Sequence, residues 1–161
     1  KAAEARTLAV AVRGDVDAAF ENLKGAIEFL KKKENVDGDK MASIGWCFGG
    51  GWSYQIAKNS LGVKASIIYY GAFNPADDLQ KMRARILGNF AEKDRSIRVD
   101  NVKEFQAKLK TLSGEHEIYI YPNTTHGFAS RPGANPNFDE EAAALAKKRT
   151  TAFLQKHLQI K

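Results

Sequence analysis

Short apolar runs alternate with longer amphipathic segments along the chain, and this alternation predicts its secondary structure. Residues 63–70, VKASIIYY, are rich in β-branched and aromatic side chains, which favours a buried strand. Phe20, Leu23 and Ile27 recur every three to four positions, as expected of an amphipathic helix. The same criteria place strands at residues 40–45, 63–70, 83–90 and 115–121, and helices at residues 16–33, 49–58, 96–112 and 138–158, while residues 2–12 also favour a helix. Strands separated by helices of about ten residues or more predict an α/β domain, with a parallel sheet covered by helices on both faces.

The length of 161 residues and a hydrophobic content of 43% lead us to expect a single domain over residues 1–161. No apolar run approaches the ~20 residues of a membrane span, and no signal-peptide pattern is visible. We therefore expect a cytoplasmic protein with no membrane partner. The chain begins with Lys1 rather than Met, which leaves a periplasmic or secreted location open.

The net charge of +6 invites a nucleic-acid interpretation, but the positive residues are dispersed. The two basic runs, residues 31–33 and 147–149, lie on expected helices. Lysines near a helix C-terminus are favoured by the helix dipole, and basic runs usually form solvated faces, so we expect no nucleic-acid partner. The single cysteine excludes an internal disulfide and any CxxC pattern, and we expect neither a metal nor a cofactor.

The only cysteine lies in a glycine-rich stretch between an expected strand and an expected helix. Residues 45–49, GWCFG, match Gly-x-nucleophile-x-Gly, the nucleophile-elbow pattern, with Cys47 where serine is more usual. A turn this sharp strains the backbone at the nucleophile, and the neighbours two positions away must lack side chains so that strand and helix approach closely. The following helix points its unpaired N–H groups and the positive end of its dipole at the sulfur. Cys47 is therefore the candidate nucleophile.

Two further candidates follow other strands, and reactive groups of parallel sheets gather at the carboxyl ends of strands. Asp94 comes shortly after the expected strand 83–90, and His126 comes shortly after the strand 115–121. The chain order of nucleophile, acid and histidine is that of the α/β-hydrolase triad. Glu92 is the rival acid, which we expect to be solvated. The other histidines are weaker candidates: we expect His116 to be an exposed sheet residue and His157 a surface or capping residue of the last helix.

With these residues in place, the chain resembles the dienelactone hydrolase family, the carboxymethylenebutenolidases, a cysteine branch of the α/β-hydrolase superfamily. The resemblance rests on GWCFGG at residues 45–50, on the acid within residues 92–94, and on HGF at residues 126–128. It spans essentially all of this chain but only the latter two-thirds of a family member. It implies an α/β-hydrolase-like sheet, a triad of Cys47, His126 and Asp94, and hydrolysis of a small lactone or carboxylic ester through a thioester acyl-enzyme. The Phe48 backbone N–H would stabilise the oxyanion.

Three side chains are candidates for substrate contact. The family holds the carboxylate of its substrate with arginines, one of them a few residues beyond the histidine. Arg131 lies five residues after His126, one residue away from that spacing, and would suit an anionic lactone; the alternative is a surface arginine. Trp46 and Phe128 are expected to line a pocket, whereas packing around the elbow is the better account of Trp52.

An α/β-hydrolase normally takes several strands, and one oxyanion donor, from the segment before the helix that precedes the elbow. This chain begins at about that helix, so we expect an N-terminally incomplete domain in which the elbow strand lies at a sheet edge. A longer polypeptide, or a second chain or copy, would complete the sheet. Losing one oxyanion donor costs roughly 10²–10³ in rate, so the chain alone should be a poor catalyst. A noncatalytic or truncated binding module on the same fold is the alternative function, and a redox-sensing thiol is a weaker one because no resolving cysteine exists.

Overall fold

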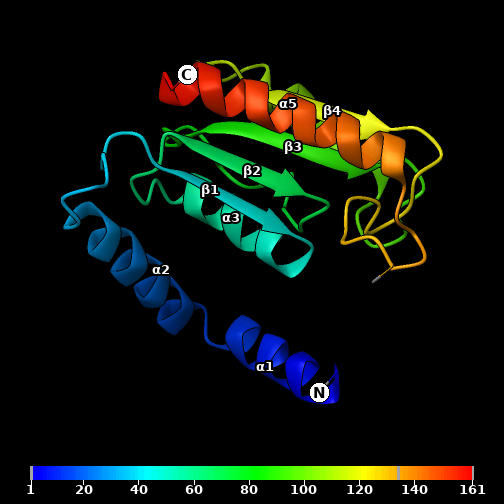
Figure 1. The fold of residues 1–161 in the computed structure, drawn as a ribbon, viewed down its shortest axis with the longest axis horizontal. Helices are drawn as coiled ribbons and strands as arrows, with labels where there is room; N and C mark the ends of the chain where they lie inside the picture. Colours follow the sequence, from blue (N-terminus) through cyan, green and yellow to red (C-terminus); the bar gives the residue numbers. More distant parts are fainter. Residues whose placement is uncertain (1, 134, 161) are drawn as a thin grey trace. The chain divides into compact units, whose positions relative to one another are not determined.

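The computed structural model describes residues 2–133 and 135–160 and contains two compact units, residues 1–38 and residues 39–161 (Figure 1). Two amino-terminal helices belong to the first unit and the sheet belongs to the second. The single domain that the sequence led us to expect stays a prediction. In the first unit, α1 (Ala2–Gly14) is followed by α2 (Val16–Lys31). The Asp15 side chain accepts a hydrogen bond from the backbone N–H of Ala18 at 3.0 Å and so caps α2, as its position predicts.

The second unit is built on a four-stranded parallel sheet. The strands are β1 (Ala42–Trp46), β2 (Ala65–Tyr69), β3 (Arg85–Ala91) and β4 (Glu117–Tyr121), in the spatial order β1-β2-β3-β4. Every residue of β2 is buried because this strand has neighbours on both sides and helices on both faces. Among the described residues β1 pairs only with β2, so the strand that leads to Cys47 is an edge strand, as predicted. Whether another segment or chain pairs with this edge stays a prediction.

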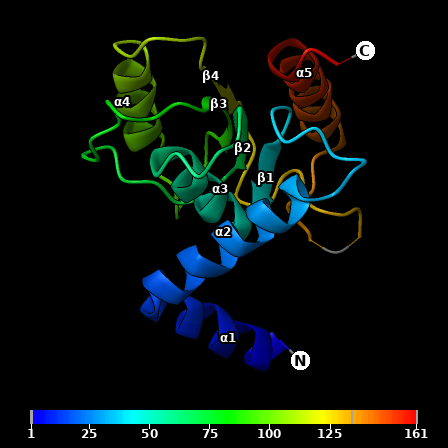
Figure 2. The ribbon, with the colours of Figure 1, turned by 90° about the vertical axis from the view of Figure 1, so that its left-hand side faces the viewer.

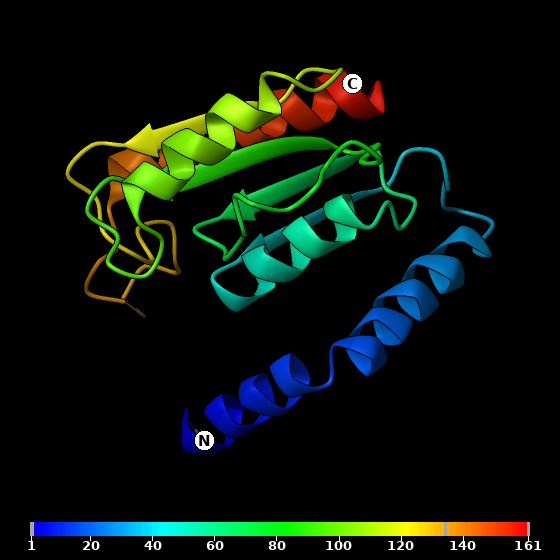
Figure 3. The same cartoon turned by 180° about the vertical axis from the view of Figure 1, so that it is seen from behind.

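Helices cover both faces of the sheet, as the alternation of elements predicts. Figures 2 and 3 show α3 (Phe48–Lys58) and α4 (Val99–Leu109) on one face, and α5 (Glu140–Leu158) on the other. A buried cluster joins α5 to the sheet; its members include Ala65, Ile67, Tyr69, Leu87, Tyr121, Ala146 and Phe153. The hydroxyls of Tyr69 and Thr150 form a buried hydrogen bond of 2.8 Å, which fixes α5 over the centre of the sheet. The carboxyl ends of all four strands therefore meet at one edge of a rigid support.

The element boundaries differ from the sequence prediction where side chains capture backbone groups. We expected a helix from residue 96, but α4 begins at Val99. The Asp94 carboxylate accepts hydrogen bonds from the backbone N–H groups of Ser96 and Ile97, at 2.8 and 3.0 Å, which holds these residues in a turn. None of the helices within residues 2–133 and 135–160 combines the length and apolar character that crossing a membrane requires.

Candidate active site

Cys47 stands at the junction between β1 and α3. Its backbone has a φ of 52° and a ψ of −114°, a left-handed conformation that is strained for a residue with a side chain. The backbone N–H of Cys47 donates to the carbonyl of Tyr69 at 2.9 Å, which continues the pairing of β1 with β2 past the end of the strand. The thiol does not cap α3, and it is exposed. The turn thus presents the sulfur at the carboxyl edge of the sheet.

The turn at Cys47 requires glycines at several positions, but these are not all the positions that the Gly-x-nucleophile-x-Gly motif suggests. A Cβ on Gly45 would lie 2.0 Å from the carbonyl oxygen of Gly49, so no side chain fits there. A Cβ on Gly50 would lie 2.8 Å from the carbonyl oxygen of Tyr69, and one on Gly71 would lie 2.2 Å from the carbonyl carbon of Gly50. Gly49 itself faces open space. The steric requirement that we expected at Gly45 and Gly49 therefore falls on Gly45 and Gly50, with Gly71 as their counterpart on the chain after β2.

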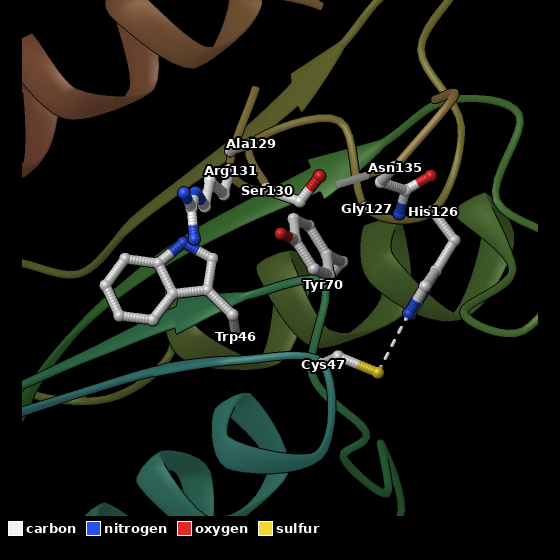
Figure 4. A pocket seen from close by; sticks show the side chains of 9 residues that line it. All are labelled: Trp46, Cys47, Tyr70, His126, Gly127, Ala129, Ser130, Arg131 and Asn135. Carbon is white, nitrogen blue, oxygen red and sulfur yellow. Dashed lines mark hydrogen bonds between the residues drawn. The ribbon is translucent and has the colours of Figure 1, made fainter. Parts of the chain in front are cut away.

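The structure brings Cys47, His126 and Asp94 together. The Nε2 of His126 lies 3.1 Å from the Sγ of Cys47 (Figure 4), and its Nδ1 lies 2.8 Å from Oδ2 of Asp94. The Asp94 side chain is fully buried, and its second oxygen is held by the turn that precedes α4. One side chain thus orients the imidazole, and the opposite edge of the ring reaches the thiol. This arrangement can move a proton between sulfur and imidazole.

The electrostatics of the three side chains favour a protonated imidazole. Burial by itself would raise the pKa of Asp94, but hydrogen bonds from His126 and from the backbone of Ile97 and Ser96 hold that pKa below its ordinary value. The hydrogen bond to Asp94 raises the pKa of His126 from 6.5 to about 9, with burial opposing the shift and the contact with Cys47 adding to it. The ring therefore retains a proton at neutral pH once it has accepted one.

The loops after β3 and β4 are tied together, and this connection positions both His126 and Asp94. The backbone N–H of Lys93 donates to the carbonyl of Thr124 at 2.9 Å. Glu92, the rival acid, accepts a hydrogen bond from the backbone N–H of Asn123 at 2.8 Å, so its exposed carboxylate serves the turn and does not contact the imidazole. The side-chain amide of Asn137 donates to the carbonyl of His126 at 2.8 Å and fixes the histidine from the other side.

The other two histidines lie far from the elbow, and both are less exposed than we expected. The Nδ1 of His116 accepts a hydrogen bond from the backbone N–H of Ile86 at 3.1 Å, which extends the pairing of β3 beyond the start of β4. Burial lowers the pKa of His116, so this acceptor nitrogen stays unprotonated. His157 packs its ring against Phe153, with centroids 4.3 Å apart, and is largely buried. Both residues serve the structure.

A pocket of about 550 Å³ opens beside Cys47 and His126. Its lining residues are Trp46, Cys47, Tyr70, His126, Gly127, Ala129, Ser130, Arg131 and Asn135 (Figure 4). Two of the residues that we selected for substrate contact, Trp46 and Arg131, are among them. Trp46 stacks on Tyr69, with ring centroids 5.0 Å apart, so it forms a firm aromatic wall. Among the described residues, no three His, Cys, Asp or Glu side chains are grouped so as to hold a metal ion.

Phe128, which we expected at the pocket wall, is instead fully buried. Its ring packs against Tyr121 and Tyr70, with centroids 4.8 and 5.5 Å away. It supports the pocket from beneath and offers no surface to a ligand. Trp52 packs edge-on against Phe48 at 6.2 Å, consistent with the structural role that we favoured.

Tyr70 and Ser130 are pocket residues that were not among the candidates from the sequence, and Tyr70 lies nearer the elbow in the sheet. It directly follows β2, and the register that pairs Trp46 with Tyr69 places it beside Cys47. Its backbone φ of 38° is left-handed, and its ring lies edge-on to the imidazole of His126, with centroids 5.0 Å apart. Its position at the carboxyl end of a buried strand was the available signal.

The strand-turn-helix elbow, the parallel sheet and the chain order of Cys47, Asp94 and His126 define an α/β-hydrolase-like protein. The dienelactone hydrolase family matches residues 1–158, and the chain belongs to this family. A provisionally named carboxymethylenebutenolidase of Saccharolobus solfataricus is 30% identical over 135 residues, which cover 83% of this chain and 51% of that protein. The chain spans about half the length of the curated relatives it matches.

Solved structures agree on the fold. A dienelactone hydrolase-like promiscuous phosphotriesterase from metagenomic libraries superposes with a TM-score of 0.81 at 20% identity, over 98% of this chain and 69% of that one. An α/β-hydrolase enzyme from a Medee basin deep-sea metagenome library gives a TM-score of 0.72 at 15% identity, over 86% of this chain and 64% of that one. At these identities the likeness concerns the α/β-hydrolase-like fold.

Proposed function

We propose that this chain carries the reactive centre of a cysteine hydrolase, which cleaves a small lactone or carboxylic ester through a thioester acyl-enzyme. The observation that supports this proposal is the continuous contact from sulfur to imidazole to carboxylate, at 3.1 and 2.8 Å. Membership of the dienelactone hydrolase family gives the same reaction class. A buried acid that orients a histidine, which in turn reaches a nucleophile, is the arrangement that activates weak nucleophiles in enzymes.

Acylation uses each of the three side chains. His126 Nε2 accepts the thiol proton, and the sulfur of Cys47 attacks the carbonyl carbon of the substrate. Phe48 follows the nucleophile and begins α3, and its backbone N–H would donate to the oxyanion of the tetrahedral intermediate. The intermediate collapses when the C–O bond breaks and the imidazolium gives its proton to the leaving oxygen. A lactone ring opens at this step, and the hydroxyl so formed stays attached to the acyl group.

In deacylation water takes the place of the thiol as the nucleophile, and Cys47 becomes the leaving group. His126 takes a proton from water, the hydroxide attacks the thioester carbonyl, and the C–S bond breaks to release the carboxylic acid and restore the thiol. Asp94 fixes the tautomer of the ring in both halves, because its carboxylate accepts from Nδ1 and leaves Nε2 to face the sulfur and the substrate. Arg131, which lines the pocket and is exposed, would bind an acidic group of the substrate at the pocket rim.

The test is turnover of p-nitrophenyl acetate by the chain and by its Cys47→Ala and His126→Ala variants. Both variants should lose at least about 10³-fold in kcat, because removing one member of a concerted group removes most of its effect. Circular dichroism and thermal unfolding establish that the variants are folded. If Cys47→Ala keeps the activity of the parent chain, the proposed function is wrong.

A further inference from the structure

The pocket contains two hydroxyl groups that the proposed mechanism does not use. Tyr70 lines the pocket, and its hydroxyl makes no hydrogen bond to any other residue in the described part of the chain. Figure 4 shows this hydroxyl directed into the pocket, on the side away from His126. The Oγ of Ser130 is buried and has no hydrogen-bond partner within residues 2–133 and 135–160. A buried polar group without a partner, such as the Ser130 hydroxyl, is rare in folded proteins. The Tyr70 hydroxyl opens into the pocket, where a ligand can accept its hydrogen bond.

Tyr70 is held in this position with a strained backbone conformation, which indicates a role in the site. Tyr70 is only 2% exposed, so its side chain is almost entirely packed against other residues. The small exposed part of the side chain faces the pocket. The ring is fixed by Phe128 beneath it and by His126 beside it, with centroids 5.5 and 5.0 Å away. The backbone φ of 38° is left-handed, a strained conformation for a residue with a side chain, and such residues cluster at functional sites.

The position of Tyr70 relative to Cys47 determines which part of a substrate the Tyr70 hydroxyl would contact. Cys47 donates its backbone N–H to the carbonyl of Tyr69, so Tyr70 is the residue beside Cys47 on the neighbouring strand end. Tyr70, Ser130 and Trp46 line the pocket beside the sulfur, so an acyl group attached to Cys47 would extend toward them. The contact is therefore with the acyl part of the substrate, and it rests on the function proposed above.

We propose that Tyr70 is a specificity-determining residue: together with Ser130, its hydroxyl donates a hydrogen bond to a neutral oxygen on the acyl chain, such as an ether, keto or hydroxyl oxygen near the thioester carbonyl. The substrates favoured by this pocket are then acyl compounds that carry a second oxygen function. A neutral acceptor suits the position better than an anion, because a carboxylate beside Cys47 would repel the sulfur as it becomes anionic. Burial, with a further contribution from the neighbouring Cys47, raises the pKa of Tyr70, so the phenol remains a donor throughout the working range of the site.

The experiment compares two esters of equal shape, p-nitrophenyl methoxyacetate and p-nitrophenyl butyrate, which differ by an oxygen in place of a methylene. The measured quantity is kcat/KM for the methoxyacetate divided by kcat/KM for the butyrate. The intrinsic reactivity of each ester cancels when this ratio in a variant is compared with the ratio in the parent chain. Tyr70→Phe removes only the hydroxyl and should lower the ratio by about 2- to 10-fold, the effect of one hydrogen bond. Ser130→Ala should lower it in the same direction. Tyr119→Phe is the matched control, since the hydroxyl of Tyr119 bonds Glu117 at 2.7 Å outside the pocket, and its ratio should equal that of the parent.

The outcomes separate this inference from the proposed function. An unchanged ratio in both Tyr70→Phe and Ser130→Ala overturns the inference, and so does an equal loss on both esters, which would mean that Tyr70 acts only through His126. Turnover that survives in Cys47→Ala contradicts the proposed function instead. A second measurement needs no turnover: methoxyacetamide should protect Cys47 from iodoacetamide better than butyramide does, and Tyr70→Phe should remove the difference. Equal protection by the two amides in the parent chain also overturns the inference.

Discussion

The Sγ of Cys47 lies 3.1 Å from the Nε2 of His126, although 79 residues separate them along the chain. One residue stands at the end of β1 and the other in the loop after β4, so they come from opposite edges of the sheet. The loop from β4 therefore has to cross the carboxyl ends of the intervening strands. Its connections to Asp94 and to Asn137 are what hold the imidazole there.

Asp94→Asn should leave the chain folded and reduce kcat on p-nitrophenyl acetate by about 10²–10⁴. An asparagine still accepts hydrogen bonds from Ser96 and Ile97, but it cannot hold the imidazole with its Nδ1 protonated as a carboxylate does. Glu92→Gln is the control, because Glu92 serves only the turn at Asn123, and it should stay within about twofold of the parent chain. Equal losses in the two variants would show that the acid has been assigned incorrectly.

The reactivity of the thiol should depend on its neighbour. Cys47 is the only cysteine and is exposed, so iodoacetamide labels one site, which mass spectrometry can follow. At neutral pH we expect the alkylation rate to fall about tenfold or more in His126→Ala, because the variant lacks the group that takes the thiol proton. A rate that is the same in both proteins would mean that the 3.1 Å contact does not activate the sulfur.

The stability contributed by His126 should decline at alkaline pH. Its pKa is raised from 6.5 to about 9 in the folded chain, so the folded state binds this proton more tightly than the unfolded state does. The stabilisation is complete below about pH 6.5 and is lost as the pH rises through about 9. Comparing the melting temperatures of the parent chain and His126→Gln from about pH 6 to about pH 10 isolates this residue. The difference between them should shrink over that interval, and a difference that grows with pH would contradict the assigned shift.

The glycines of the elbow should tolerate substitution very differently. Gly45→Ala places a methyl 2.0 Å from a backbone oxygen of α3, and moving a strand or helix to relieve it should cost on the order of 3 kcal/mol and remove activity. Gly49→Ala meets no atom within 4 Å and lies on a helix, where alanine is favoured by about 1 kcal/mol. Denaturant unfolding of both variants tests this contrast. If Gly49→Ala is the more damaging substitution, the geometry assigned to the turn is wrong.

Local patterns were enough to predict the strands and helices, because each segment has its own hydrophobic period or its own composition, which does not depend on the adjoining segments. The alternation of these elements also predicted the parallel sheet with helices on both faces, and the resemblance to the α/β-hydrolases predicted the edge position of β1. Boundaries were less accurate. The start of α4 shifted to Val99 because the side chain of Asp94 bonds the backbone of the preceding turn, a contact that no periodicity reveals.

The candidate residues at strand ends were found because parallel topology collects such residues at one edge, and this rule needs only the order of elements. Packing around them could not be found in this way. Phe128 and Tyr70 are both aromatic residues near the site, yet one is buried beneath the pocket and the other opens into it. Which side chain faces the cavity depends on contacts between the end of β2, β4 and the loop that follows β4.

The sequence by itself determined the elbow, the chain order of Cys47, Asp94 and His126, and the type of sheet that carries them, since short-range sterics and hydrophobic periodicity specify each of these locally. Only the tertiary structure decided which glycines are sterically required, that Phe128 is buried beneath the pocket, and that Tyr70 and Ser130 border it. Those outcomes depend on distances between segments remote along the chain, and such distances are fixed only when the sheet and its helices pack together.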